Sequence, residues 1–112
     1  MTTKNTPIQP MNLVGKQKKY LRGLAHHLEP VVYVGREGLS DMLLQSVNDT
    51  FKTRELIKIK LGQNCDVTKK TAADQLAQMT GATLVQLIGK TIILYRPNKD
   101  LKKEQRIILP KK

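Results

Sequence analysis

The fold of this chain is decided by the stretch Val31-Val32-Tyr33-Val34-Gly35-Arg36-Glu37-Gly38-Leu39-Ser40. Its first four residues form a continuous apolar run, which predicts a short strand that is covered on both faces or lies centrally in a sheet. Two glycines bracket the loop that follows, and Ser40 is a good N-cap for a helix after it. Amides in such a loop and in the first turn of the helix favour a bound anion.

A helical pattern precedes this stretch, from Lys16 to Leu28. Apolar residues at helical spacing predict a buried stripe, and basic residues occupy the opposite side. The predicted stripe comprises Tyr20, Leu21, Leu24, Ala25 and Leu28. Pro30 ends the helix because it disfavours helical backbone at the residue before it. Residues 1–14 carry two prolines and no apolar period, so they predict a flexible leader.

Three elements are predicted directly after Ser40. A helix up to about Arg54 buries Leu43, Leu44, Val47 and Phe51. Residues 56–61 then alternate between apolar and basic side chains, which predicts a half-exposed strand. Thr68 caps a third helix, which Gly81 closes in the left-handed conformation. The predicted inner face of this helix comprises Ala72, Ala73, Leu76, Ala77 and Met79.

The folded part ends in a predicted hairpin, residues 82–88 and 91–96, whose Gly89-Lys90 loop favours a type II′ turn. Residues 98–112 follow as a basic tail in which only Ile107, Ile108 and Leu109 are suited to dock. The predicted order is helix, strand, helix, strand, helix, strand, strand. This order indicates an α/β (α+β) two-layer sandwich with a mixed four-stranded sheet, occupying residues 15–97.

The chain is strongly basic. Its 112 residues include 20 Lys and Arg but only 9 Asp and Glu, so the formal net charge is +11. Four of these net charges fall in residues 1–19, three in residues 20–98 and four in residues 99–112. This distribution is typical of a protein that binds a polyanion. The alternative is that basic ends only keep a small protein soluble.

Several chemistries lack the residues that they need. Cys65 is the only cysteine, which is typical of a reducing compartment, and its neighbours supply no base to activate it. His26 and His27 are adjacent and point in different directions on a helix, so no metal site is predicted. No apolar run reaches the roughly 20 residues that span a bilayer. We therefore expect a soluble cytoplasmic protein with no catalytic residue, metal, cofactor or membrane partner.

The Gly35-x-x-Gly38 loop is the first candidate binding site. Arg36 adds a charge-assisted donor suited to phosphate oxygens, whereas the Glu37 carboxylate would repel a phosphate unless it turns away or pairs. The spacing matches neither a nucleotide-hydrolase phosphate loop nor a dinucleotide fingerprint, so ATP and NAD are not predicted. The alternative is an ordinary turn from strand to helix.

A second candidate is the basic side of the first helix, which contains no acid from Lys16 to Leu28. Its cations are Lys16, Lys18, Lys19 and Arg22. Weaker candidates are Lys58, Lys60, Lys90 and Arg96. Aromatic residues are few and tryptophan is absent, so recognition is expected to depend on phosphate and shape, with little base stacking.

Three segments in order resemble a known family: residues 13–25, residues 31–40 and residues 89–97. They are similar to a stand-alone CRM domain (chloroplast RNA splicing and ribosome maturation) of the bacterial YhbY type. The resemblance implies a domain similar to the C-terminal domain of translation initiation factor three, with a Gly-x-x-Gly loop like that of KH domains. It places Gly35, Arg36 and Gly38 in this loop beside the basic helix, and Glu37 departs from the small or neutral residue expected there.

The resemblance also implies a function. Bacterial single-domain members are associated with precursors of the large ribosomal subunit, and plant relatives with group II intron splicing. We expect a monomeric RNA-binding protein, not an enzyme, that binds ribosomal RNA in the precursor of the large subunit through the loop and the helix. The alternatives are a permanent ribosomal or nucleoid component and a small enzyme that acts on RNA.

Overall fold

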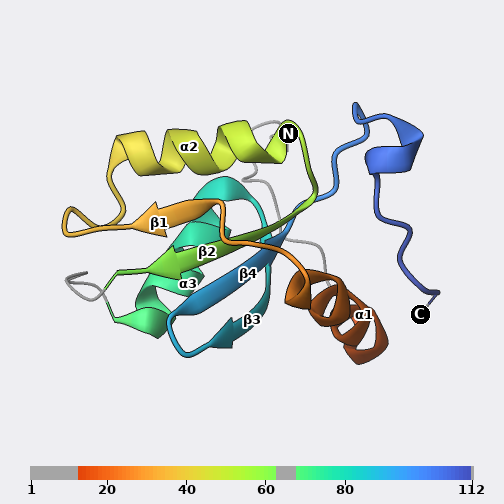
Figure 1. Ribbon diagram of the computed structural model, residues 1–112, viewed down its shortest axis with the longest axis horizontal. Coiled ribbons are helices and arrows are strands. Elements are labelled where there is room, and N and C mark those ends of the chain that lie inside the picture. Colours follow the sequence, from red (N-terminus) through yellow and green to blue (C-terminus); the bar gives the residue numbers. More distant parts are fainter. Residues whose placement is uncertain (1–12, 63–67, 112) are drawn as a thin grey trace, which may run out of the picture.

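Four strands form one sheet in the order β1-β2-β4-β3 (Figure 1), within residues 13–62 and 68–111, which the computed structural model describes. The strands are β1 (Val32–Val34), β2 (Leu56–Leu61), β3 (Thr83–Ile88) and β4 (Thr91–Tyr95). β1 is parallel to β2, whereas the pairs β2–β4 and β3–β4 are antiparallel. The predicted α+β class with a mixed four-stranded sheet is therefore confirmed.

The second and third helices begin where their capping residues, Ser40 and Thr68, predict. The helices are α1 (Gly15–His26), α2 (Asp41–Phe51) and α3 (Lys69–Thr80). The Ser40 hydroxyl accepts a hydrogen bond from the Leu43 backbone amide at 3.2 Å. The Thr68 hydroxyl accepts one from the Thr71 backbone amide at 3.3 Å. Gly81 ends α3 with a φ of 73°, in the left-handed region that favours glycine. The helix boundaries thus follow from local hydrogen bonds that the sequence already encodes.

Helices pack on both faces of the sheet, although α1 covers only part of its face, so the expectation of two layers is wrong. Ile57, Ile59 and Leu94 point into the core beneath α2 and α3. The alternate residues Leu56 and Tyr95 point the other way, into a second core with α1. This second core also contains Leu13, Leu21, Ala25, Val85 and Ile93. The basic helix therefore forms a third layer over part of the sheet.

β1 is an edge strand with one exposed face, so the expectation of a strand that is covered on both faces or lies centrally in the sheet is wrong. Within the described part of the chain β1 pairs with β2 alone, and its central residue, Tyr33, is 66% exposed. Val32 and Val34 are buried beneath α2, so successive side chains point to opposite faces as in any strand. The apolar run thus reflects one buried face and one exposed tyrosine.

The β3–β4 hairpin has the predicted turn. Gly89 has a φ of 54°, and Lys90 is not in the positive-φ region, which is the pattern of a type II′ turn. The Leu61 amide donates to the Lys90 carbonyl at 2.7 Å, which ties the tip of the hairpin to the end of β2.

Two side chains depart from the predicted inner faces of the helices. Tyr20 on α1 is 43% exposed, and Met79 on α3 is 59% exposed. Gln17 is buried on α1 instead, because its amide accepts the Val14 N–H and donates to the Pro110 carbonyl. Its partner at Pro110 lies 93 residues away, which helical periodicity does not reveal.

The basic tail runs back along the α1 side of the molecule. Ile107 and Leu109 pack against the core beneath α1, whereas Ile108 is exposed. The buried Glu55 carboxylate accepts the Asn98 and Ile107 amides at 2.6 Å each and pairs with Arg106 at 3.2 Å. The tail also contains the short 3-10 helix η2 (Lys103–Gln105).

Candidate nucleic-acid interface

The loop between β1 and α2 is a tight turn closed by its two glycines. The Gly38 amide donates to the Gly35 carbonyl at 3.0 Å, and Gly38 has a φ of 66°. A Cβ atom at Gly35 would meet nothing within 4 Å. Glycine is thus required by the backbone only at Gly38, whereas position 35 has open space in front of it.

Charges around this turn face solvent. Arg36 and Glu37 are exposed, and neither forms an ion pair with a residue in the described ranges. A groove of about 410 Å³ lies between the turn and the first two turns of α2. It is lined by Tyr33, Gly35, Arg36, Glu37, Gly38, Ser40, Met42, Leu43 and Ser46. Arg36, Glu37 and the two glycines of the turn thus line one concave surface together with the start of α2.

The amides at the start of α2 contribute less to an anion site than the sequence suggests. The Ser40 hydroxyl already accepts the Leu43 amide, and Asp41 places a carboxylate in the first turn. The hydroxyl occupies one free amide of the first turn, and the carboxylate offsets the positive end of the helix dipole. An anion at this loop would therefore depend chiefly on the turn itself and on Arg36.

The basic side of α1 is the second candidate. Lys16 and Lys19 are exposed, Lys18 and Arg22 are half-buried, and none forms an ion pair with a described residue. A shallow hollow of about 520 Å³ borders this side. Its lining residues are Lys16, Lys19, Tyr20, Gly23, Leu24 and Pro110.

The structure does not place the loop and α1 next to each other. In Figure 1 the turn that follows β1 lies at the left, whereas α1 lies at the lower right. The chain order explains this separation, because α1 precedes β1 and the turn follows it. The two candidate surfaces are therefore distinct, and the expectation that the basic helix lies next to the loop is wrong.

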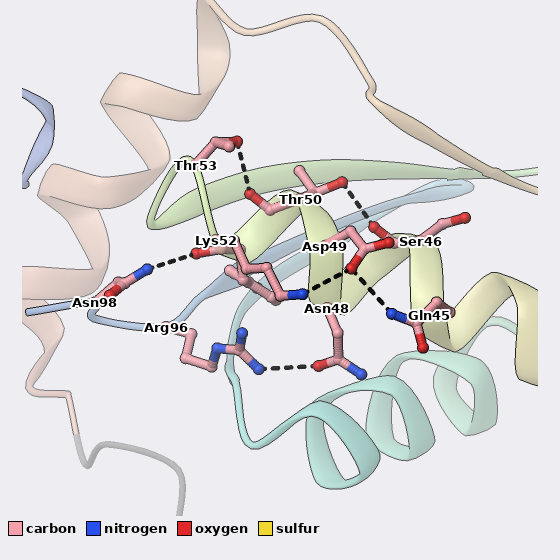
Figure 2. A network of polar contacts seen from close by, with 10 residues as sticks. Gln45, Ser46, Asn48, Asp49, Thr50, Lys52, Thr53, Arg96 and Asn98 are labelled. Atoms are coloured by element: carbon pink, nitrogen blue, oxygen red, sulfur yellow. Dashed lines mark hydrogen bonds and ion pairs between the residues drawn. The ribbon is translucent and has the colours of Figure 1, made fainter. Parts of the chain in front are cut away.

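Lys58 and Arg96 are tied into the fold. The Lys58 ammonium donates to the Ala25 and Leu28 carbonyls at the C-terminal end of α1, at 3.1 and 3.2 Å. This contact covers β2 at Lys58, on the face that was expected to be exposed, and leaves Lys60 exposed. Arg96 donates to Asn48 at 3.0 Å (Figure 2) and to the Thr80 carbonyl at 2.7 Å.

Arg96 is also partly shielded from solvent. Its guanidinium lies 4.5 Å from the centre of the Phe51 ring, and burial lowers the pKa of this group from its usual value. Figure 2 shows it pointing to α2 and not away from the molecule. We therefore leave Lys58 and Arg96 out of the proposed interface.

A model of the CRS1 / YhbY (CRM) domain matches residues 13–96, which include the turn, α1 and the whole sheet. The chain belongs to this family. "Probable RNA-binding protein YqeI" from Bacillus subtilis is 42% identical over 90 residues, which cover 80% of this chain and 94% of that protein. "RNA-binding protein" from Haemophilus influenzae is 40% identical over 97 residues, covering 87% and 94%.

A solved structure is similar as well. It is the solution structure of SAV1595 from Staphylococcus aureus, called "a putative RNA binding protein". The TM-score is 0.73 at 42% sequence identity, and the match covers 88% of this chain and 100% of the other. The family resemblance expected from three sequence segments is thus confirmed for the CRM domain.

Lys60 and Lys90 remain exposed in this CRM domain and form no ion pair with any described residue. Lys60 on β2 lies opposite Tyr33 in the β1–β2 register, and Tyr33 is two residues before the turn. Sequence reasoning did not assign Tyr33 to the site. The strict alternation of residues 32–34 is the signal that would have found it, because it sets Tyr33 opposite to two buried valines.

Two further observations concern the described part of the CRM domain. No helix in residues 13–62 and 68–111 is long and apolar enough to cross a membrane. In the same ranges, no group of three or more His, Cys, Asp or Glu residues is placed to hold a metal ion. The predictions for Cys65 and for residues 1–12 of the leader lie outside the described residues.

Proposed function

We propose that this CRM domain binds RNA through two surfaces, the turn at residues 35–38 and the basic side of α1. The four cations gathered on α1, where no acidic residue occurs from Lys16 to Leu28, carry the proposal. Lys52, Lys70 and Arg106 each pair with a carboxylate, whereas the cations of the turn and of α1 have no acidic partner among the described residues. Cations left unneutralised on two separate surfaces suit a long polyanion. Relatives named as RNA-binding proteins support RNA as that polyanion.

The turn is proposed to hold a phosphate at its open side. Position 35 has no side chain to block the approach of a phosphate to the backbone. Arg36 supplies a planar donor pair that matches phosphate oxygens. Glu37 opposes the phosphate by charge, which makes the turn a moderate rather than a strong anion site. The cations of α1 then bind phosphates farther along the same RNA.

An aspartate at position 35 tests the turn. Gly35→Asp adds one negative charge where a Cβ atom meets nothing within 4 Å, so the fold is expected to be unchanged. We expect about tenfold weaker binding to a fluorescently labelled ribosomal RNA transcript, because the added carboxylate repels the phosphate. Fluorescence anisotropy at 50 mM salt measures the change.

Two variants control for net charge. Gln78→Glu adds the same charge at an exposed position on α3, on the face away from α1, and should leave the affinity within about twofold. Glu37→Gln removes a charge in the turn and should tighten binding a few-fold. Equal weakening by Gly35→Asp and Gln78→Glu would show that only net charge matters and would contradict a phosphate site at the turn.

We further propose that the RNA is ribosomal and that the protein assists assembly of the large subunit without catalysis. The family resemblance in the sequence supports this finer proposal. Fractionation of cell extracts on a sucrose gradient tests it, and we expect the protein with precursors of the large subunit only. Stoichiometric presence in mature subunits would indicate a permanent component. RNA cleavage or modification by the purified protein that a single substitution abolishes would indicate an enzyme.

A further inference from the structure

Four side chains form a row across the open part of the sheet. Tyr33 lies opposite Lys60, Lys60 opposite Thr91, and Thr91 opposite Ile88. Side chains that are paired in register point to the same face of a sheet. The four residues therefore line up across β1, β2, β4 and β3. We call them the open row.

The open row lies on the same face as α1, beyond the part that α1 covers. Lys58 lies on this face and is held by the carbonyls of α1. Lys60 is two residues farther along β2, about 7 Å away, and it is exposed. Because β1 continues from the open row into the turn, the row lies between the covered part of the sheet and the turn.

The open row combines an aromatic ring with a cation. Tyr33 is 66% exposed and Ile88 is 55% exposed. The Tyr33 ring stacks on no other aromatic ring among the described residues. Lys60 is exposed beside it, and no acidic residue belongs to the row. An exposed ring with a neighbouring cation is the combination that binds a base and its phosphate together.

We propose that Tyr33 stacks on an unpaired nucleobase of the bound RNA while Lys60 contacts its phosphate. This inference rests on the proposed function and specifies its substrate as RNA with unpaired bases. The faces of a base inside an RNA duplex are not accessible to a side chain. The RNA strand then continues toward the turn at residues 35–38, where its next phosphate contacts Arg36. The expectation of little base stacking is thereby replaced by one stacking site at the end of β1.

The test uses the full chain and two probes, a fluorescein-labelled (A)₁₂ RNA and a 12-base-pair RNA duplex. Tyr33→Ala is expected to bind (A)₁₂ about tenfold more weakly and the duplex within about twofold of the unchanged protein. Tyr33→Phe keeps the ring and should bind both probes normally. Met79→Ala removes an exposed apolar side chain of α3, outside both proposed surfaces, as the control and should leave binding of both probes unchanged.

A spectroscopic readout supplements affinity. The chain has no tryptophan, so Tyr33→Trp introduces a single reporter at the proposed site. Stacking should quench its fluorescence on addition of (A)₁₂ and not on addition of the duplex. The dependence of affinity on salt should be the same for Tyr33→Ala as for the unchanged protein, because a stacking contact carries no charge.

Different failures have different meanings. If the unchanged protein binds neither probe at 50 mM salt, the proposed function itself is wrong. If it binds both and Tyr33→Ala binds (A)₁₂ equally well, only the stacking site is wrong. Equal losses for the two probes would also overturn it. If the free protein forms a dimer and Tyr33→Ala dissociates it, the open row is an interface with a second copy of the chain. That result would also overturn the stacking site.

Discussion

Glu55→Ala is expected to lower the free energy of unfolding by about 3 kcal/mol, a large share of the 5–15 kcal/mol typical of a domain. Glu55 is 1% exposed, and its carboxylate accepts three hydrogen bonds, from the backbone amides of Asn98 and Ile107 and from the Arg106 side chain. Its removal leaves amides without an acceptor and an arginine without its partner. Urea unfolding followed by circular dichroism measures the loss.

A surface acid provides the matched control. Asp74 pairs with Lys70 at 3.8 Å, and both side chains are more than half exposed. Asp74→Ala removes the same kind of group from an i,i+4 pair and should cost no more than about 0.5 kcal/mol. Similar unfolding midpoints for the two variants would contradict the role of Glu55 as the anchor of the tail.

The elements of this fold were predictable because their signals are local. The alternation of residues 56–61 gave β2, and the capping hydroxyls of Ser40 and Thr68 gave the starts of two helices. Gly81 and Gly89 marked a helix end and a hairpin, since both positions need a positive φ. Each of these features depends on residues a few positions apart, which periodicity and turn preferences describe well.

The layers were not predictable in the same way. Nothing in the helical stripe of α1 indicates which face of the sheet it covers, and the partners that decide it, Leu56 and Tyr95, are distant in sequence. Glu55 is a clearer case. Its position directly before β2 suggests an exposed acidic residue. Its hydrogen-bond partners, however, lie 43 to 52 residues later in the sequence. The burial of such a residue depends on where the tail runs, which no local pattern encodes.

The candidate site was predicted in part, and its geometry was not. The turn and the cations of α1 were named from sequence, and the structure leaves Arg36, Lys16 and Lys19 exposed. Their separation follows from the chain path, because a helix that leads into a strand and a loop that leaves it tend to lie at opposite ends of that strand. Tyr33 was missed because an apolar run was interpreted as buried on both faces.

The separation of the turn and α1 predicts that their contributions to RNA binding add. Arg36→Ala should lower the slope of log affinity against log salt by about 0.7 to 0.9, the share of one phosphate contact. Lys16→Ala with Lys19→Ala should lower it by about twice that amount. The triple variant combines Arg36→Ala, Lys16→Ala and Lys19→Ala. Relative to the unchanged protein, we expect its salt slope to be lower by about two to three and its affinity for RNA to be about 100-fold weaker at 50 mM salt.

Additivity distinguishes two surfaces from one. Substitutions at distant sites without shared partners usually add to within about 0.5 kcal/mol, roughly a factor of two in affinity. Gln78→Ala combined with Arg36→Ala is the control, since Gln78 lies on α3, away from α1. If the triple variant binds no more weakly than Arg36→Ala alone, α1 does not contact the RNA. A loss far above the product of the separate effects would mean that the turn and α1 bind the same phosphates, which their positions at opposite ends of the molecule in Figure 1 do not allow.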